Sequence, residues 1–170
     1  MSVIAPPGTW TVDAGRSSVG WSVKHLGVTT VHGTAGEFAG MLADGHATGT
    51  VAAASLQTDD PKRDDYVRSA EFLDAEAFPQ LRFTADASGA EADGITGELT
   101  IRGTTLPLTL HVRSADAGAR EVHLELTGTA LRRPYGLKFP QAFGAADRSV
   151  TDEVELVLDL VLVPADASLS

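Results

Sequence analysis

The residues of this chain that could do acid–base or metal chemistry are five histidines and an excess of carboxylates. The histidines are spread along the sequence at His25, His32, His46, His111 and His123. None of them forms an HxH or HExxH pair, the spacings by which histidines of one strand or one helix hold zinc. His25 and His32 flank a predicted turn, so a metal site with a carboxylate such as Glu37 is only a weak alternative. The sequence predicts no metal site and no cofactor.

Nucleophilic catalysis has no sequence signature either. The chain contains no Cys, which excludes disulfides, thiol catalysis and cysteine metal ligands. It contains no G-x-S-x-G motif and no phosphate-binding loop. Its many carboxylate pairs are read as solvated faces. The sequence therefore favours a binding protein over an enzyme, and no residue is assigned a catalytic role.

Composition limits the class of protein. The 170 residues are 43% hydrophobic, enough for the core of one soluble domain. The formal charge of −10 disfavours a nucleic-acid partner or an anionic membrane surface, and a mean hydropathy near zero argues against stable insertion in a membrane. Residues 1–8 lack the basic and apolar regions of a signal peptide, so a cytoplasmic location is expected. We expect one domain over residues 9–164, with flexible termini at 1–8 and 165–170.

The segment from Gly94 to Val112 reads as a β-hairpin. On each arm, aliphatic residues alternate with polar ones at the period of two that is typical of a half-buried strand. The aliphatic positions of the two arms are Ile95, Leu99 and Ile101, and Leu106, Leu108, Leu110 and Val112. Gly103, Thr104 and Thr105 are predicted to form the turn. Since one hairpin is marginal in water, more sheet must cover its apolar face.

The rest of the chain supplies further strands. We predict them at residues 9–13, 17–25, 28–42, 46–54, 81–86, 121–131 and 150–163, with one helix between Pro61 and Phe78 and a loop at 134–148. Gly33, Gly36 and Gly40 suggest bulges or bends that let the sheet curl. The fold class is therefore all-β: an antiparallel barrel of about eight strands with one short helical insert, whose interior at that size can hold one small ligand.

Three sequence blocks and a short motif resemble the YceI-like family of lipocalin-like, polyisoprenoid-binding proteins. The blocks are WTVDAGRSSVGWSVKHLGVTTVHGTAGEFAG from Trp10, SLQTDDPKRDDYVRSAEFLDAEAFPQLRF from Ser55 and GELTIRGTTLPLTL from Gly97, followed by RRPYGL near Arg133. The resemblance implies an extended lipocalin-like barrel with a helix near one end. It also implies an apolar channel for a small hydrophobic ligand, an isoprenoid lipid such as a quinone or a prenyl intermediate.

Candidate ligand-binding residues are aromatic or aliphatic side chains that could line the channel and polar ones that could hold a headgroup. The first set is Trp21, Phe38, Phe72, Phe83 and Leu99, and the second is His25, Arg63, Asp64 and Tyr66. Each has a purely structural alternative. Trp21 could be a wall residue, His25 a hydrogen-bonded core residue, and Arg63 with Asp64 could pin the helix to the barrel.

Three functions are therefore considered. The first is a carrier or store for an isoprenoid lipid without catalysis, which we favour. The second is an enzyme acting on a hydrophobic substrate in the same cavity. The third is a barrel filled by its own side chains that serves as an interaction module. Cavity volume separates the third from the others. A homodimer through an exposed strand is left open.

Overall fold

The computed structural model describes residues 7–25, 28–87, 94–118, 120–138 and 150–165. Its regular elements are β1 Thr9–Val12, β2 Ser18–His25, β3 Thr29–Ala35, β4 Phe38–Ala43, β5 His46–Ala52, β6 Leu56–Gln57, α1 Pro61–Arg68, β7 Gln80–Asp86, β8 Ile95–Ile101, β9 Thr104–Ala117, β10 Val122–Leu131 and β11 Glu153–Pro164. The flexible termini expected from the sequence lie mostly outside the described residues.

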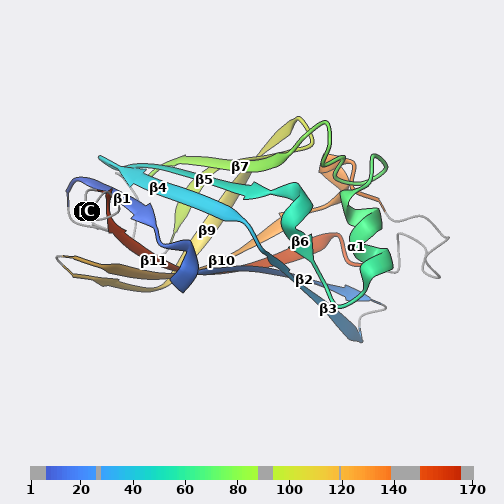
Figure 1. Ribbon diagram of the computed structural model, residues 1–170, viewed down its shortest axis with the longest axis horizontal. Coiled ribbons are helices and arrows are strands. Elements are labelled where there is room, and N and C mark those ends of the chain that lie inside the picture. The colour runs from blue at the N-terminus through green and yellow to red at the C-terminus, as the bar shows by residue number, and fades with distance from the viewer. Residues whose placement is uncertain (1–6, 26–27, 88–93, 119, 139–149, 166–170) are drawn as a thin grey trace.

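The strands form a closed antiparallel barrel. The hydrogen-bonded order runs β1-β4-β5-β7-β8-β9-β10-β11, and β11 returns to β1, so eight strands complete the ring. Every pairing is antiparallel. Beyond the ring, β2, β3 and β6 extend the sheet from β11. Figure 1 shows an elongated body with α1 at one end. The lipocalin-like barrel with one helical insert is thus confirmed.

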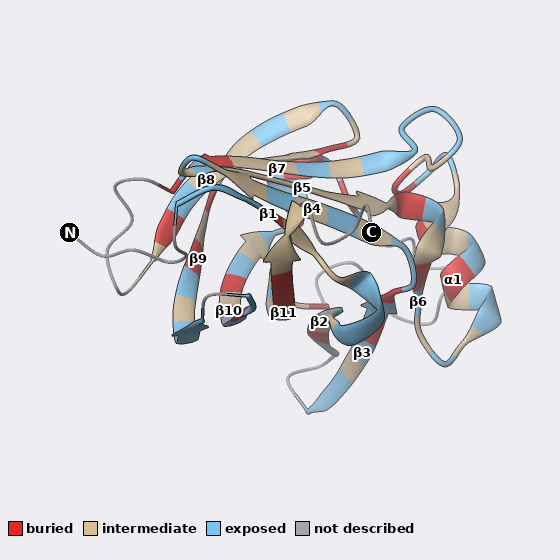
Figure 2. Cartoon of the chain, turned by 60° about the vertical axis from the view of Figure 1, so that its left-hand side comes forward, coloured by how far each residue is buried: buried red, intermediate tan, exposed pale blue. Residues whose placement is uncertain are grey.

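The predicted hairpin is present with the expected alternation. Ile95, Ile101, Leu108 and Leu110 are all buried. The turn lies one residue earlier than predicted, because Arg102 and Gly103 both adopt positive φ, 51° and 79°, and close it in two residues. Figure 2 shows a similar alternation of buried and exposed positions along β10, which pairs with β9.

Two predicted elements are wrong in extent. The single strand expected over residues 28–42 is divided into β3 and β4 by a bend at Gly36–Glu37, where the Gly36 N–H bonds to the Ser55 carbonyl. The helix expected over residues 61–78 ends at Arg68, since the Ser69 N–H and hydroxyl both bond to the Tyr66 carbonyl. Residues 69–78 continue as turns.

The remaining strands agree with the predictions to within a few residues. The last strand starts at Glu153, three residues later than expected. Part of the loop predicted at 134–148 lies outside the described residues, and its start is a 3-10 turn at Arg133–Tyr135. No helix in the described ranges is long and apolar enough to cross a membrane.

Candidate functional site

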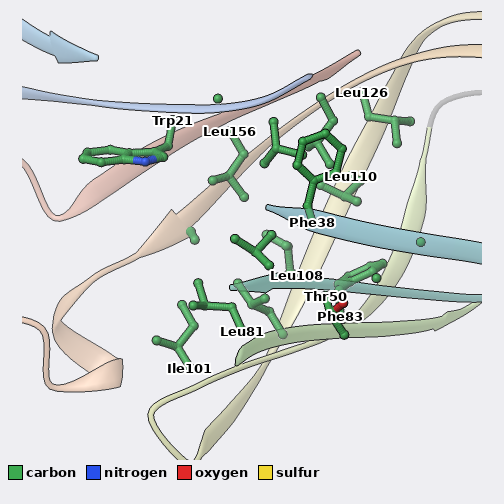
Figure 3. A pocket seen from close by; sticks show the side chains of 18 of the residues that line it. Trp21, Phe38, Thr50, Leu81, Phe83, Ile101, Leu108, Leu110, Leu126 and Leu156 are labelled. Atoms are coloured by element: carbon green, nitrogen blue, oxygen red, sulfur yellow. The ribbon is translucent and has the colours of Figure 1, made fainter. Parts of the chain in front are cut away.

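A cavity of about 290 Å³ lies inside the barrel. Strands of the ring and the extension, the helix and the 69–78 segment all contribute to its walls. Figure 3 shows the side chains converging on it from opposite sides. Representative lining residues are Trp21, Phe38, Val51, Val67, Phe72, Leu81, Phe83, Leu99, Ile101, Leu108, Leu110, Leu126, Leu156 and Leu160. The described lining is almost wholly apolar.

Strand alternation explains why the lining is apolar. On β11 the even-numbered residues from Val154 to Leu162 all line the cavity. On β10 Leu124 and Leu126 do the same, while the intervening Glu125 is exposed. Successive side chains of a strand point to opposite faces. An apolar residue at every second position is therefore enough to give the barrel an apolar interior.

The helical end of the cavity is closed by Val67, Phe72 and Leu73, which are 3–6% exposed. Arg102, in the β8–β9 turn, holds this segment by donating to the carbonyls of Phe72 at 3.1 Å and Ala70 at 2.9 Å. These bonds satisfy backbone groups that follow the end of the helix. The segment is therefore attached to the barrel both through apolar packing and through the Arg102 guanidinium.

Two of the predicted polar site residues fix the start of α1. Asp64 is 8% exposed and accepts hydrogen bonds from the Thr58 N–H at 2.8 Å and the Thr58 hydroxyl at 2.6 Å. Arg63 donates to the same hydroxyl at 3.2 Å and to Asp59 at 2.9 Å. Asp60 caps the helix by accepting from the Lys62 N–H. These contacts of Arg63 and Asp64 are local, with residues that precede the helix.

The predicted site residues thus divide into two groups. Trp21, Phe38, Phe72, Phe83 and Leu99 line the cavity, whereas His25, Arg63, Asp64 and Tyr66 are not among its lining residues. The Tyr66 hydroxyl donates to the Lys138 carbonyl at 2.9 Å, and its ring lies 5.6 Å from that of Phe72. Contact of any of these residues with a ligand stays a prediction.

Sequence reasoning missed the polar lining residues Arg132 and Tyr135. Arg132 is 2% exposed, and its guanidinium donates to the carbonyls of Leu137 at 2.7 Å, Val150 at 2.9 Å and Thr151 at 3.0 Å. The signal was available: even-numbered residues of β10 face inward, and Arg132 is the next in that series. The Tyr135 hydroxyl donates to the Leu99 carbonyl, and burial raises the pKa of this phenol.

Comparison with known proteins adds sequence relatives. A model of the YceI-like domain family matches residues 10–162. A UPF0312 protein of Pseudomonas putida is 29% identical over 139 residues, which are 73% of this chain and 72% of the relative. The protein YceI of Salmonella arizonae is 36% identical over 110 residues, 59% of this chain and 57% of the relative.

Solved structures share the fold. Burkholderia cenocepacia BcnA superposes with a TM-score of 0.72 at 21% identity, over 88% of this chain and 98% of that one. A polyisoprenoid binding domain from Saccharophagus degradans, implicated in plant cell wall breakdown, gives a TM-score of 0.74 at 12% identity, over 91% and 98%. At these identities the likeness establishes the barrel architecture.

Proposed function

This chain belongs to the YceI-like domain family, and from that premise and the cavity we propose that it binds and carries or stores an isoprenoid lipid, without catalysis. The broader statement, a family fold suited to a hydrophobic ligand, rests on the family match and the apolar interior. The finer statement, that the ligand is an isoprenoid quinone or prenyl intermediate, is our proposal. One relative of the same fold is a polyisoprenoid binding domain, which supports it.

The observation that carries the proposal is the apolar cavity. Its 290 Å³ is about ten times the roughly 30 Å³ that one water occupies in the liquid, so the cavity has space for a chain of apolar groups. Burial of apolar carbon contributes about 0.8 kcal/mol for each methylene, before the ligand's ordering cost. A prenyl chain could therefore be held tightly with few polar contacts.

The same observation weighs against the two alternatives. A barrel filled by its own side chains would leave no space of this size. For an enzyme, we would expect titratable groups with free lone pairs or protons at the cavity wall. Arg132 and Tyr135 are the titratable residues of the described lining, and both donate hydrogen bonds to backbone carbonyls. This arrangement suits a structural role better than proton transfer.

Native mass spectrometry tests the proposal. The purified protein should carry an adduct that organic extraction identifies as a prenyl or other long apolar chain. Delipidated protein should take up an added isoprenoid quinone. Protein at its bare mass that takes up no quinone would overturn the carrier function and favour the interaction module. Turnover of the added lipid would favour the enzyme. The cytoplasmic location and the absence of a cofactor stay predictions.

A further inference from the structure

The outer wall of the barrel carries a cluster of possible metal ligands that is separate from the cavity. His123 and Glu125 of β10 and Asp159 of β11 each offer one donor atom, and these atoms all lie within 4.8 Å of one another. His123 and Glu125 are exposed and Asp159 is half-buried. The His123 Nε2 and an Asp159 carboxylate oxygen are hydrogen-bonded. The sequence alone does not indicate this group, because Asp159 follows Glu125 by 34 positions.

Strand register fixes the cluster and concentrates negative charge in it. Glu125 stands directly opposite Asp159, and His123 stands directly opposite Asp116 of β9. Like charges directly opposite one another on paired strands are destabilising. Among the described residues, no lysine or arginine forms an ion pair with Glu125, Asp159 or Asp116. A bound cation would offset this repulsion.

Two arginines, Arg16 and Arg113, make their contacts with residues outside the cluster. Arg16 pairs with Asp13 and Glu121, and Arg113 donates to the Thr127 hydroxyl at 2.9 Å. Neither of these contacts involves a residue of the cluster, so the imidazole of His123 is the ion-pair partner that the described residues offer to Asp159. The arrangement is one histidine and two carboxylates whose donor atoms lie within 4.8 Å of one another, with a third acidic residue, Asp116, opposite the histidine on β9.

The donor set matches one class of ion. One imidazole nitrogen with carboxylate oxygens is a ligand set of zinc, which binds them at about 2.0–2.2 Å and places tetrahedral ligands about 3.4 Å apart. The donor atoms need to close by about 1.4 Å at most from the present 4.8 Å limit. Rotation of the exposed Glu125 side chain can supply this movement, and water can complete the coordination.

We propose that His123, Glu125 and Asp159 form a surface site for a divalent transition-metal ion of the zinc class. The ion replaces the direct hydrogen bond between His123 and Asp159 and bridges β10 to β11. Both strands line the cavity with their alternate residues, among them Leu126 and Leu158. The site thus connects two walls of the ligand cavity from outside, and it does not depend on the identity of the lipid.

Calorimetric titration of chelator-treated protein with zinc chloride tests the site. The parent protein should bind one zinc ion saturably, and His123→Ala and Asp159→Asn should each weaken binding by about tenfold or more. The ring signals of His123 in NMR spectra should shift with zinc. Zinc should also raise the melting temperature of the parent protein but not of His123→Ala.

His32→Ala is the matched control, because it removes an exposed histidine of β3 from outside the cluster. Its zinc affinity should equal that of the parent. The proposal would be overturned if the parent protein bound no zinc saturably. It would also be overturned if His32→Ala weakened zinc binding as much as His123→Ala does, or if a folded His123→Ala bound zinc as tightly as the parent. Circular dichroism establishes whether each variant is folded. If His123→Ala does not fold, Asp159→Asn still tests the site, because it removes the charge of the carboxylate and keeps the shape of the side chain.

Discussion

The indole of Trp21 lies against the backbone of Gly33, its direct partner on the neighbouring strand. A Cβ at Gly33 would stand 2.6 Å from the Trp21 Nε1 and overlap the adjoining ring carbons. Only glycine leaves space for the ring here, although Gly33 has no unusual φ. The pair therefore sets the position of one of the largest side chains on the cavity wall.

Gly33→Ala should displace this indole. We expect a loss of about 1–3 kcal/mol of unfolding free energy and a change in tryptophan fluorescence, because the ring must leave its packed position. Gly20→Ala is the control, since a Cβ there meets only ordinary contacts at 3.6 Å and beyond. Denaturant melts followed by fluorescence measure both variants. Equal stability of the two would show that the ring moves freely.

Asp64→Ala should loosen the start of α1. The substitution leaves the Thr58 N–H and hydroxyl without their acceptor in a part-buried position, which costs about 1–3 kcal/mol. Asp65→Ala is the matched neighbour: Asp65 is exposed and lies 3.6 Å from Arg68, so its loss should change stability by less than about 0.5 kcal/mol. Similar destabilisation by both variants in urea melts would refute the role given to Asp64.

Arg132→Lys should destabilise the chain after β10 although it keeps the charge. Three guanidinium nitrogens reach three different carbonyls, and an ammonium on a flexible stem does not reproduce that planar fork. With carbonyls left unsatisfied in a buried place, we expect a loss of about 2–4 kcal/mol. A thermal melt unchanged from the parent would mean that these bonds contribute no net stability.

Alternation made most of the barrel predictable. Leu99, Leu108, Leu110 and the even-numbered residues of β11 face inward as a period of two requires. The helix end was not predictable in the same way, because Ser69 stops α1 through a local side-chain bond in a segment without clear periodicity. The bend that divides β3 from β4 depends on the Ser55 carbonyl, which the fold brings there.

The polar part of the site was harder to predict than the apolar part. Arg63 and Asp64 were candidates for a headgroup because of their residue types, yet their partners are Thr58 and Asp59, a few residues away. Arg132 was overlooked because its partners lie mostly on a segment that follows it by about twenty residues. Residue type indicates capacity for hydrogen bonding, whereas only the fold decides which partner satisfies it.

Gly49→Leu should fill the cavity and block the ligand. Gly49 lines the cavity opposite Phe83, and a Cβ there meets nothing closer than the Ala39 carbonyl at 3.8 Å, so a leucine has space to extend inward. We expect lipid uptake to fall by about tenfold, with the fold intact. Thr30→Leu, on the exposed side of β3, adds a leucine outside the lining and should bind as the parent does. Unchanged uptake by Gly49→Leu, measured by native mass spectrometry, would place the ligand elsewhere.

Asp159→Asn should lower the pKa of His123. The hydrogen bond to Asp159 is the largest cause that raises this pKa, and the charges of Asp159, Glu125 and Glu121 add to it. An NMR titration of the histidine ring, with a chelator present, measures the change directly. Asp116, which stands opposite His123 on β9, is unchanged in the variant, so any effect of its charge on the His123 pKa is common to both titrations. An unchanged titration midpoint would contradict the assignment.

The same pair should make stability depend on pH, with a sign that follows from the raised pKa. The folded protein binds the His123 proton more tightly than the unfolded chain, so the stabilisation is fully present below the unfolded value of about 6.5 and fades as the pH rises through the folded pKa. Asp159→Asn should therefore lower the melting temperature more at about pH 5.5 than at about pH 8.5. At the higher pH the substitution also relieves the repulsion between Glu125 and Asp159, which stand opposite one another, so the variant there should equal or exceed the parent. A larger loss at the higher pH would mean that Asp159 stabilises the barrel through some contact other than protonated His123.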